Sequence, residues 1–174
     1  MLERMKYKRI NIIGPPGSGK TTLARKLAKA YELPIIHMDK IAFSETYYFL
    51  EDRPGFIKKI KQEAKAEKWI MEGVYKFTLD FRVPMADLTI YLDLPPSVYV
   101  YRIFKRRVQY RNKIREEMPE SWNERIDPGF LKYVLNFSRE QSPVIRAELS
   151  KYPKDKIVTL RSSRVVKHFL SSLK

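Results

Sequence analysis

The chain has 174 residues, 44% of them hydrophobic, and we expect a single domain over residues 1–174 with a buried core. The sequence contains no cysteine, which excludes disulfides, thiol catalysis and cysteine-based metal sites, and no long apolar run, which argues against a signal peptide or a membrane span. We therefore expect a cytoplasmic protein with no membrane contact, whose net charge of +15 attracts polyanions such as nucleic acids or phosphorylated small molecules.

The first predicted strand, residues 7–13, runs into the sequence Gly-Pro-Pro-Gly-Ser-Gly-Lys-Thr at 14–21, which fits G-x-x-x-x-G-K-[ST]. Residues 22–30 then have helical spacing, with one apolar face formed by Leu23, Leu27 and Ala30. Such a loop gathers backbone N–H groups around phosphate oxygens at a helix N-terminus. The predicted nucleotide-binding residues are Gly14, Pro15, Gly17, Ser18, Gly19, Lys20, Thr21 and Thr22.

Within this site, we expect Lys20 to reach the β- and γ-phosphates and the Thr21 hydroxyl to bind Mg²⁺. The alternative is a glycine-rich turn that only closes a βα unit.

A second predicted strand, residues 33–39, ends in polar residues. Asp39 would then lie at the sheet edge where open α/β folds bind ligands. It is a candidate for holding a substrate hydroxyl, or a water on Mg²⁺, with a helix N-cap as the alternative. We expect His37 to be packed rather than catalytic.

An acceptor flap is predicted over about residues 40–68. Its aromatic residues either pack in the core or form an apolar wall for the acceptor. Pro54 begins a helix in this flap, which carries on one side Phe56, Ile57, Ile60 and Ala64.

A third strand over residues 69–73 ends in Glu72, at the same predicted edge as the phosphate loop. A carboxylate there can orient the hydration shell of Mg²⁺, take a proton or contact substrate. The alternative is an exposed acid at the end of a strand. Arg82 follows in a short segment, where it could bind an acceptor phosphate through two nitrogens or be an ordinary surface arginine.

The fourth strand, residues 88–95, leads into a basic helix whose core-facing residues we predict to be Val100, Ile103, Phe104 and Val108. Arg102 and Arg106 are four residues apart on the other side. Like charges at this spacing destabilise a helix unless an anion lies between them. We therefore expect both to neutralise polyphosphate charge, with a solvated helix face as the alternative.

Residues 109–127 have no apolar stripe and are predicted to form a mobile lid from which Arg111, Arg115 and Arg125 could enter a closed site. A helix is predicted from Asp127-Pro128 onward, with an interruption at Pro143. A fifth strand over 156–160 and a closing helix over 165–173 complete the pattern. Strands separated by helical segments predict an α/β fold in which a five-stranded parallel sheet has helices on both faces.

Taken together, these residues resemble the P-loop kinases of the adenylate-kinase-like group, and most closely the DNA topology modulation protein family. The resemblance covers roughly residues 8–170 and rests on residues 14–22, 37–39, 69–75, 86–87 and 91–95, together with Arg102, Arg106 and Arg107. It implies a P-loop NTPase-type three-layer sandwich with a lid. It also implies roles for individual residues, namely Arg102 against adenine, Arg106 on phosphates, Glu72 near Mg²⁺, Arg82 on the acceptor phosphate, and Arg161, Ser162 and Ser163 beside adenine.

The sequence therefore predicts an ATP-dependent phosphotransferase with ATP and Mg²⁺ as cofactors and a nucleotide, nucleoside or other small molecule as acceptor. Its predicted catalytic residues are Lys20, Arg102, Arg106 and Asp39; Thr21 and Glu72 are the predicted metal ligands, and Asp39, Glu72 and Arg82 the predicted substrate contacts. The alternative is a basic nucleic-acid-binding protein with ATP as a regulatory ligand. The positive charge and the interleaved aromatic residues favour this alternative. The absence of a known nucleic-acid-binding motif from the sequence argues against it. The acceptor and the oligomeric state stay open.

Overall fold

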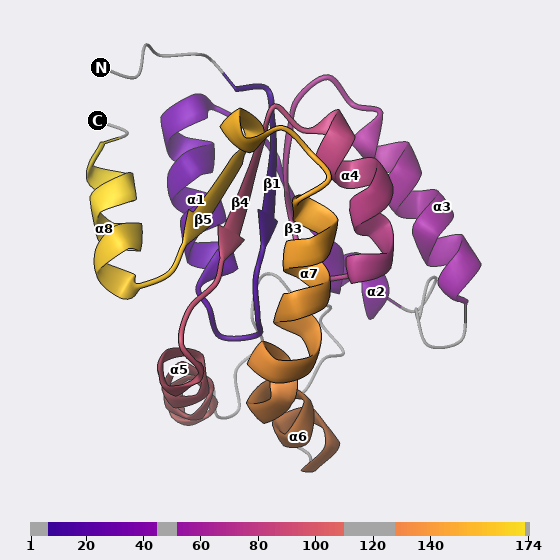
Figure 1. The fold of residues 1–174 in the computed structure, drawn as a ribbon. Coiled ribbons are helices and arrows are strands. Elements are labelled where there is room, and N and C mark those ends of the chain that lie inside the picture. The colour runs from indigo at the N-terminus through magenta and orange to yellow at the C-terminus, as the bar shows by residue number, and fades with distance from the viewer. Residues whose placement is uncertain (1–6, 45–51, 110–127, 173–174) are drawn as a thin grey trace.

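The computed structural model describes residues 7–44, 52–109 and 128–172 (Figure 1). Its centre is a five-stranded parallel sheet in the order β2-β3-β1-β4-β5. The prediction of a five-stranded parallel sheet is confirmed. The strands are β1 (Arg9–Ile13), β2 (Ile35–His37), β3 (Trp69–Glu72), β4 (Leu88–Leu92) and β5 (Ile157–Leu160).

Helices lie on both faces of this sheet, as predicted for a three-layer sandwich. In Figure 1, α1 and α8 lie on one side of the strands and α3, α4 and α7 on the other. The α-helices are α1 (Lys20–Tyr31), α2 (Met38–Ala42), α3 (Arg53–Ala64), α4 (Leu79–Met85), α5 (Pro96–Gln109), α6 (Pro128–Asn136), α7 (Ser142–Leu149) and α8 (Ser163–Ser171). Short turns of other helix types are η1 (Lys76–Thr78), η2 (Phe137–Gln141) and η3 (Lys154–Lys156).

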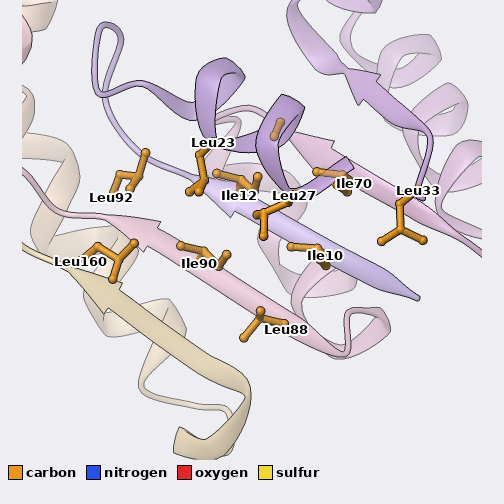
Figure 2. Close-up of a cluster of buried hydrophobic side chains, with 11 residues drawn as sticks. Ile10, Ile12, Leu23, Leu27, Leu33, Ile70, Leu88, Ile90, Leu92 and Leu160 are labelled. Atoms are coloured by element: carbon orange, nitrogen blue, oxygen red, sulfur yellow. The ribbon is translucent and has the colours of Figure 1, made fainter. Parts of the chain in front are cut away.

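Alternation along the strands divides the core between the two faces. Successive side chains of a strand point to opposite sides, so Ile10 and Ile12 of β1 pack under α1, while Ile13 joins the cluster on the opposite face. Figure 2 shows the first cluster, in which Leu23 and Leu27 of α1 lie against residues of β1, β3 and β4. The predicted apolar face of α1 is partly wrong, because Ala24 is buried there and Ala30 is exposed.

The orientation of α5 also differs from the prediction. Its buried residues are Tyr99 and Ile103, whereas Phe104 and Val108 are 47% and 78% exposed. The helix packs against the phosphate loop: a Cβ on Gly17 would lie 2.6 Å from the Tyr99 carbonyl oxygen. Counting apolar residues misjudged this face because α5 packs against the backbone of the glycine loop as well as against Val134 and Phe137.

The chain after Pro128 forms one helical run from α6 through η2 into α7. Pro143 does not end this run. It occupies the first turn of α7, directly after the π-helical turn η2, where the helix tolerates the missing N–H group of proline. Further along, the Ser162 hydroxyl caps α8 by accepting a hydrogen bond from the Val165 N–H at 3.2 Å.

Some sequence predictions fall outside the described residues. These are the lid beyond Gln109, with Arg111, Arg115 and Arg125, the helix start at Asp127, and the aromatic part of the acceptor flap over residues 45–51. In the part of the chain that the structure describes, no helix is both long and apolar enough to cross a membrane.

The topology defines where a ligand would bind. Because all five strands are parallel, their carboxyl ends share one edge, the end at which α5 and α6 lie in Figure 1. The phosphate loop follows β1, the central strand, whose neighbours β3 and β4 flank it. Open parallel sheets bind ligands at this edge.

Candidate active site

The loop between β1 and α1 has the backbone that an anion site needs. Gly17 and Gly19 have φ angles of 76° and 97°, which side chains with a Cβ rarely adopt. The Ser18 N–H donates to the Pro15 carbonyl oxygen at 3.1 Å and tightens the turn. Gly19 is the N-cap of α1 and offers no side chain to cap it. The first N–H groups of this helix can therefore bind an anion, with support from the helix dipole.

Lys20 and Thr21 begin α1 directly after the loop. The Lys20 ammonium donates to the Pro15 carbonyl oxygen at 3.0 Å and so lies against the loop itself. The Thr21 hydroxyl donates to Oε1 of Glu72 at 3.1 Å, which joins α1 to the end of β3. Thr22, also predicted to bind nucleotide, is exposed on the first turn.

Glu72 has a second partner that the sequence did not reveal. His37 Nδ1 lies 2.9 Å from Glu72 Oε1, and because the carboxylate accepts, this nitrogen carries the hydrogen. The contact follows from the sheet, since His37 and Glu72 are register partners on neighbouring strands β2 and β3. His37 is therefore part of the site rather than only packed beside it. Sequence order does not indicate which strands are neighbours, so no local pattern pointed to this pair.

The surroundings of Glu72 keep it charged. Its side chain is only 3% exposed, so the alternative of an exposed terminal acid is wrong. Burial by itself would raise the pKa of Glu72, but the hydrogen bond with His37 and the charge of Lys20 outweigh it and hold the pKa below its ordinary value. An ionised carboxylate thus lies beside the Thr21 hydroxyl.

These oxygen atoms fit Mg²⁺ as part of a larger ligand set. Mg²⁺ prefers hard oxygen donors and is bound by one or two protein groups together with phosphates and water. Thr21 and Glu72 supply such donors. Among the described residues, no group of three or more histidine or acidic side chains could hold a metal ion. The site therefore fits the ion only where a nucleotide and water complete the coordination.

The two arginines predicted on the basic helix have different surroundings. Arg102 donates from Nη1 to the Ser18 carbonyl oxygen at 2.9 Å and from Nη2 to the Ser163 hydroxyl at 3.1 Å. It thus joins the phosphate loop to the start of α8. Arg106 lies one turn further along α5 and is half-buried. The rotated packing of α5 therefore brings Arg102 to the loop.

Asp39 lies two residues beyond β2, in the first turn of α2, where His37 is the N-cap. Its Oδ1 accepts a hydrogen bond from the Tyr75 hydroxyl at 2.8 Å. Burial and then the charge of Asp39 raise the pKa of Tyr75 well above its ordinary value. Burial and then the same carboxylate raise the pKa of Tyr133 on α6 to about 12. Two protonated phenols therefore accompany Asp39.

Sequence reasoning assigned no role to these two tyrosines. Tyr75 lies three residues after Glu72, the residue for which the sequence analysis considers this segment. Tyr133 lies on α6, far along the chain from Asp39, and only the fold brings them into electrostatic contact.

Arg82 does not have the surroundings of a substrate contact. Its side chain is 0% exposed. Its guanidinium donates from Nη1 to Asn11 Oδ1 at 2.9 Å and from Nη2 to the carbonyl oxygens of Gly73 and Tyr75 at 3.3 and 3.5 Å. The alternative of a surface arginine is wrong, and the geometry argues against the predicted contact with an acceptor phosphate. Arg82 instead fixes the turn that follows Glu72.

The comparisons with known proteins agree with this architecture. The profile of the family described as "ATPase family associated with various cellular activities (AAA)" matches residues 10–74, which include the phosphate loop. A cytidylate kinase from Pyrobaculum arsenaticum is 31% identical in an alignment of 111 residues, with 56% of this chain and 59% of that relative covered. The match thus spans about three fifths of the relative's length.

Solved structures match over almost the whole chain. The deoxyadenosine kinase from M. mycoides with bound dATP has a TM-score of 0.55 at 13% identity and covers 95% of this chain and 98% of that one. The shikimate kinase from Aquifex aeolicus has a TM-score of 0.54 at 19% identity, with 95% of both chains covered. The fold is therefore that of a P-loop NTPase of the kinase-like type.

Proposed function

We propose that the protein is an ATP-dependent phosphotransferase that moves the γ-phosphoryl group of Mg·ATP to a small acceptor. The proposal rests on the hydrogen bond of 3.1 Å between the Thr21 hydroxyl and the Glu72 carboxylate. The neighbouring Lys20 donates to a carbonyl oxygen of the phosphate loop. Within this class, the motifs at residues 69–75 and 91–95 favour a relative of the DNA topology modulation protein family.

On the donor side, the loop N–H groups and Lys20 would hold the triphosphate, with Arg102 beside the base and Arg106 on the phosphates. Bound Mg²⁺ would neutralise charge on the β- and γ-phosphate oxygens, with Thr21 and Glu72 as its protein partners. Phosphoryl transfer needs positioning and charge stabilisation more than covalent help from the protein. These residues supply both.

On the acceptor side, Asp39 is the candidate group for orienting the acceptor and for taking its proton. It lies at the same sheet edge as Glu72, on the element that follows β2. The printed names of the similar proteins, a cytidylate kinase and the deoxyadenosine and shikimate kinases, support a small-molecule acceptor.

A coupled assay of ADP release over a panel of nucleosides, nucleoside monophosphates and sugars tests the proposal. At least one acceptor should stimulate ADP release well above the rate with ATP and Mg²⁺ alone. The double variant Lys20→Ala, Arg106→Ala should abolish this stimulation without unfolding the protein. Lys26→Ala changes an exposed residue on the same helix as Lys20, and it should leave the stimulation intact. Full turnover by the double variant would contradict the assignments.

A further inference from the structure

Two side chains from separate elements hold the carboxylate of Glu72. Resting on the kinase function proposed above, we propose that His37 is a positioning residue for the metal ion, because it fixes the Glu72 carboxylate with one oxygen available to Mg²⁺ or to its bound water. In this proposal His37 touches neither the nucleotide nor the acceptor and acts only through Glu72. Loss of its donor nitrogen should therefore weaken metal binding and leave the binding of metal-free nucleotide unchanged.

The first argument is that both hydrogen bonds end on the same carboxylate oxygen. The Thr21 hydroxyl lies 3.1 Å from Glu72 Oε1, and His37 Nδ1 lies 2.9 Å from the same atom. Neither of these bonds uses Oε2. That oxygen therefore keeps its lone pairs for a further partner. Carboxylate oxygens are ligands that suit Mg²⁺, directly or through the water that the ion retains.

The second argument is that one hydrogen bond would not fix the carboxylate. The last torsion of a glutamate side chain has a broad minimum, and the hydrogen of the Thr21 hydroxyl can rotate to follow its acceptor. The imidazole of His37 adds a rigid, planar donor. Because Thr21 comes from α1 and His37 from β2, rotation of the carboxylate would break at least one of the two bonds.

The third argument is that the sheet itself places the ring. His37 is the last residue of β2 and the register partner of Glu72 on β3. Side chains in register on neighbouring strands point to the same face, so the backbone brings the imidazole to the carboxylate. The side chains of His37 and Glu72 are 18% and 3% exposed. Little water competes for their hydrogen bond, which is stronger there than at the surface.

A role of His37 in stability alone makes a different prediction. A purely structural hydrogen bond, once removed, would lower the free energy of unfolding and weaken nucleotide binding with and without the metal alike. A positioning bond, once removed, changes the metal-dependent part of binding. Side chains that orient a metal ligand in this way typically contribute a factor of about 10 to 100 in metal affinity. The two roles can therefore be separated by measurement.

The test compares three replacements of His37 that differ in where they place a donor. His37→Asn puts an amide nitrogen near the position of Nδ1, and His37→Leu has the same branching without a donor. His37→Gln carries its amide one carbon further from the backbone. The measured quantity is the Kd of a non-hydrolysable ATP analogue, with Mg²⁺ and with EDTA. The ratio of the two values gives the factor by which the metal tightens binding.

We expect His37→Leu to reduce this factor about tenfold and His37→Asn to retain most of it. His37→Gln should resemble His37→Leu, and this pair of amides decides the question even where His37→Leu does not fold. The Kd in EDTA should be the same in every folded variant. His168→Leu, which removes the exposed histidine of α8, is the control and should change neither value.

Two results would overturn the inference and leave the kinase function intact. One is an unchanged factor in His37→Leu and His37→Gln. The other is an equal loss in the asparagine and glutamine variants, because a donor at the Nδ1 position would then bring no advantage. A wild-type protein that binds no nucleotide would instead overturn the kinase function itself.

Nitrogen NMR of the wild-type protein tests the geometry without a substitution at His37. The chain has two histidines, so the spectrum of His168→Asn identifies the signals of His37. At about pH 8, where free histidine is neutral, Nδ1 of His37 should carry a hydrogen. A neutral ring with its hydrogen on Nε2 would overturn the inference, since Nδ1 could not then donate to Glu72.

Discussion

The proposed donor and acceptor sides of the site are built in different ways. The donor side is local and cationic: the loop over residues 14–19 provides backbone groups, and Lys20 and Arg102 bring positive charge to it. The proposed acceptor side draws on the end of β3, the start of η1, α2 and α6, and carries carboxylates and phenols. One short stretch of sequence therefore contains the proposed triphosphate site, whereas the residues proposed for the acceptor come together only in the fold.

The largest expected effect breaks the donor side. In Gly17→Ala, the alanine would have to adopt a φ of 76°, which strains its backbone. Its Cβ would also lie only 2.6 Å from the Tyr99 carbonyl oxygen, which is a steric clash. We expect ATP binding to be lost and the free energy of unfolding to fall by about 3 kcal/mol. Calorimetry and urea unfolding measure these two effects.

The matched control is Gly19→Ala. Its φ of 97° also strains alanine, but the new Cβ would meet only the Arg102 Nη1 at 3.5 Å. This variant should lose about half as much stability. Equal losses for both would mean that the packing of α5 against the loop contributes nothing.

A second change tests the group that joins the two sides. Glu72→Gln keeps the size of the side chain but removes the charge beside Thr21. We expect phosphoryl transfer to fall about 100-fold and the Mg²⁺ concentration for half-maximal rate to rise. Glu63→Gln on α3, an acid paired with Lys59, should change neither. An unaltered Mg²⁺ dependence in Glu72→Gln would contradict the proposed metal contact.

Arg102→Lys sharpens the comparison on the donor side alone. The two acceptors are bound by different guanidinium nitrogens, and the single nitrogen of a lysine cannot take both places, so the bridge from the Ser18 carbonyl to the Ser163 hydroxyl would be lost. ATP affinity should weaken about tenfold by fluorescence titration, with no change in the relative rates of different acceptors. Arg164→Lys, on the exposed side of α8, serves as the control. A change in acceptor preference would contradict the separation of the two sides.

The smallest expected effect lies in the pH dependence of stability. The pKa of Tyr133 is raised to about 12, so the folded state keeps this proton more firmly than the unfolded chain. Its contribution to stability is complete below pH 10 and is lost as the pH rises toward 12. In urea unfolding between pH 9 and 11.5, Tyr133→Phe should therefore lose less stability with rising pH than the wild type. Tyr101→Phe, 65% exposed, should follow the wild type.

The same contrast explains which features could be predicted from the sequence. The phosphate loop, the parallel sheet and the placement of Glu72 follow from local patterns and from the rule that parallel strands share one edge. The bond between His37 and Glu72 depends on β2 lying beside β3. The enclosure of Arg82 depends on Asn11, a buried polar residue of β1 that looks ordinary in the sequence.

The face of α5 illustrates a different limit. Counting apolar residues favoured Phe104 and Val108, but the helix meets a glycine loop, so its position is set by how closely backbone can approach backbone. Propensity and periodicity contain no information about such a partner. The charge interaction between Tyr133 and Asp39 likewise depends on the fold, because the two residues are far apart in the sequence.

Titration of Mg·ATP into the protein, combined with hydrogen exchange over residues 14–22, tests the central claim most directly. We predict measurable heat with a stoichiometry of about one, and slower exchange of the loop and first-turn amides, since these N–H groups would bind phosphate oxygens. No heat and unchanged exchange in this segment would contradict the account.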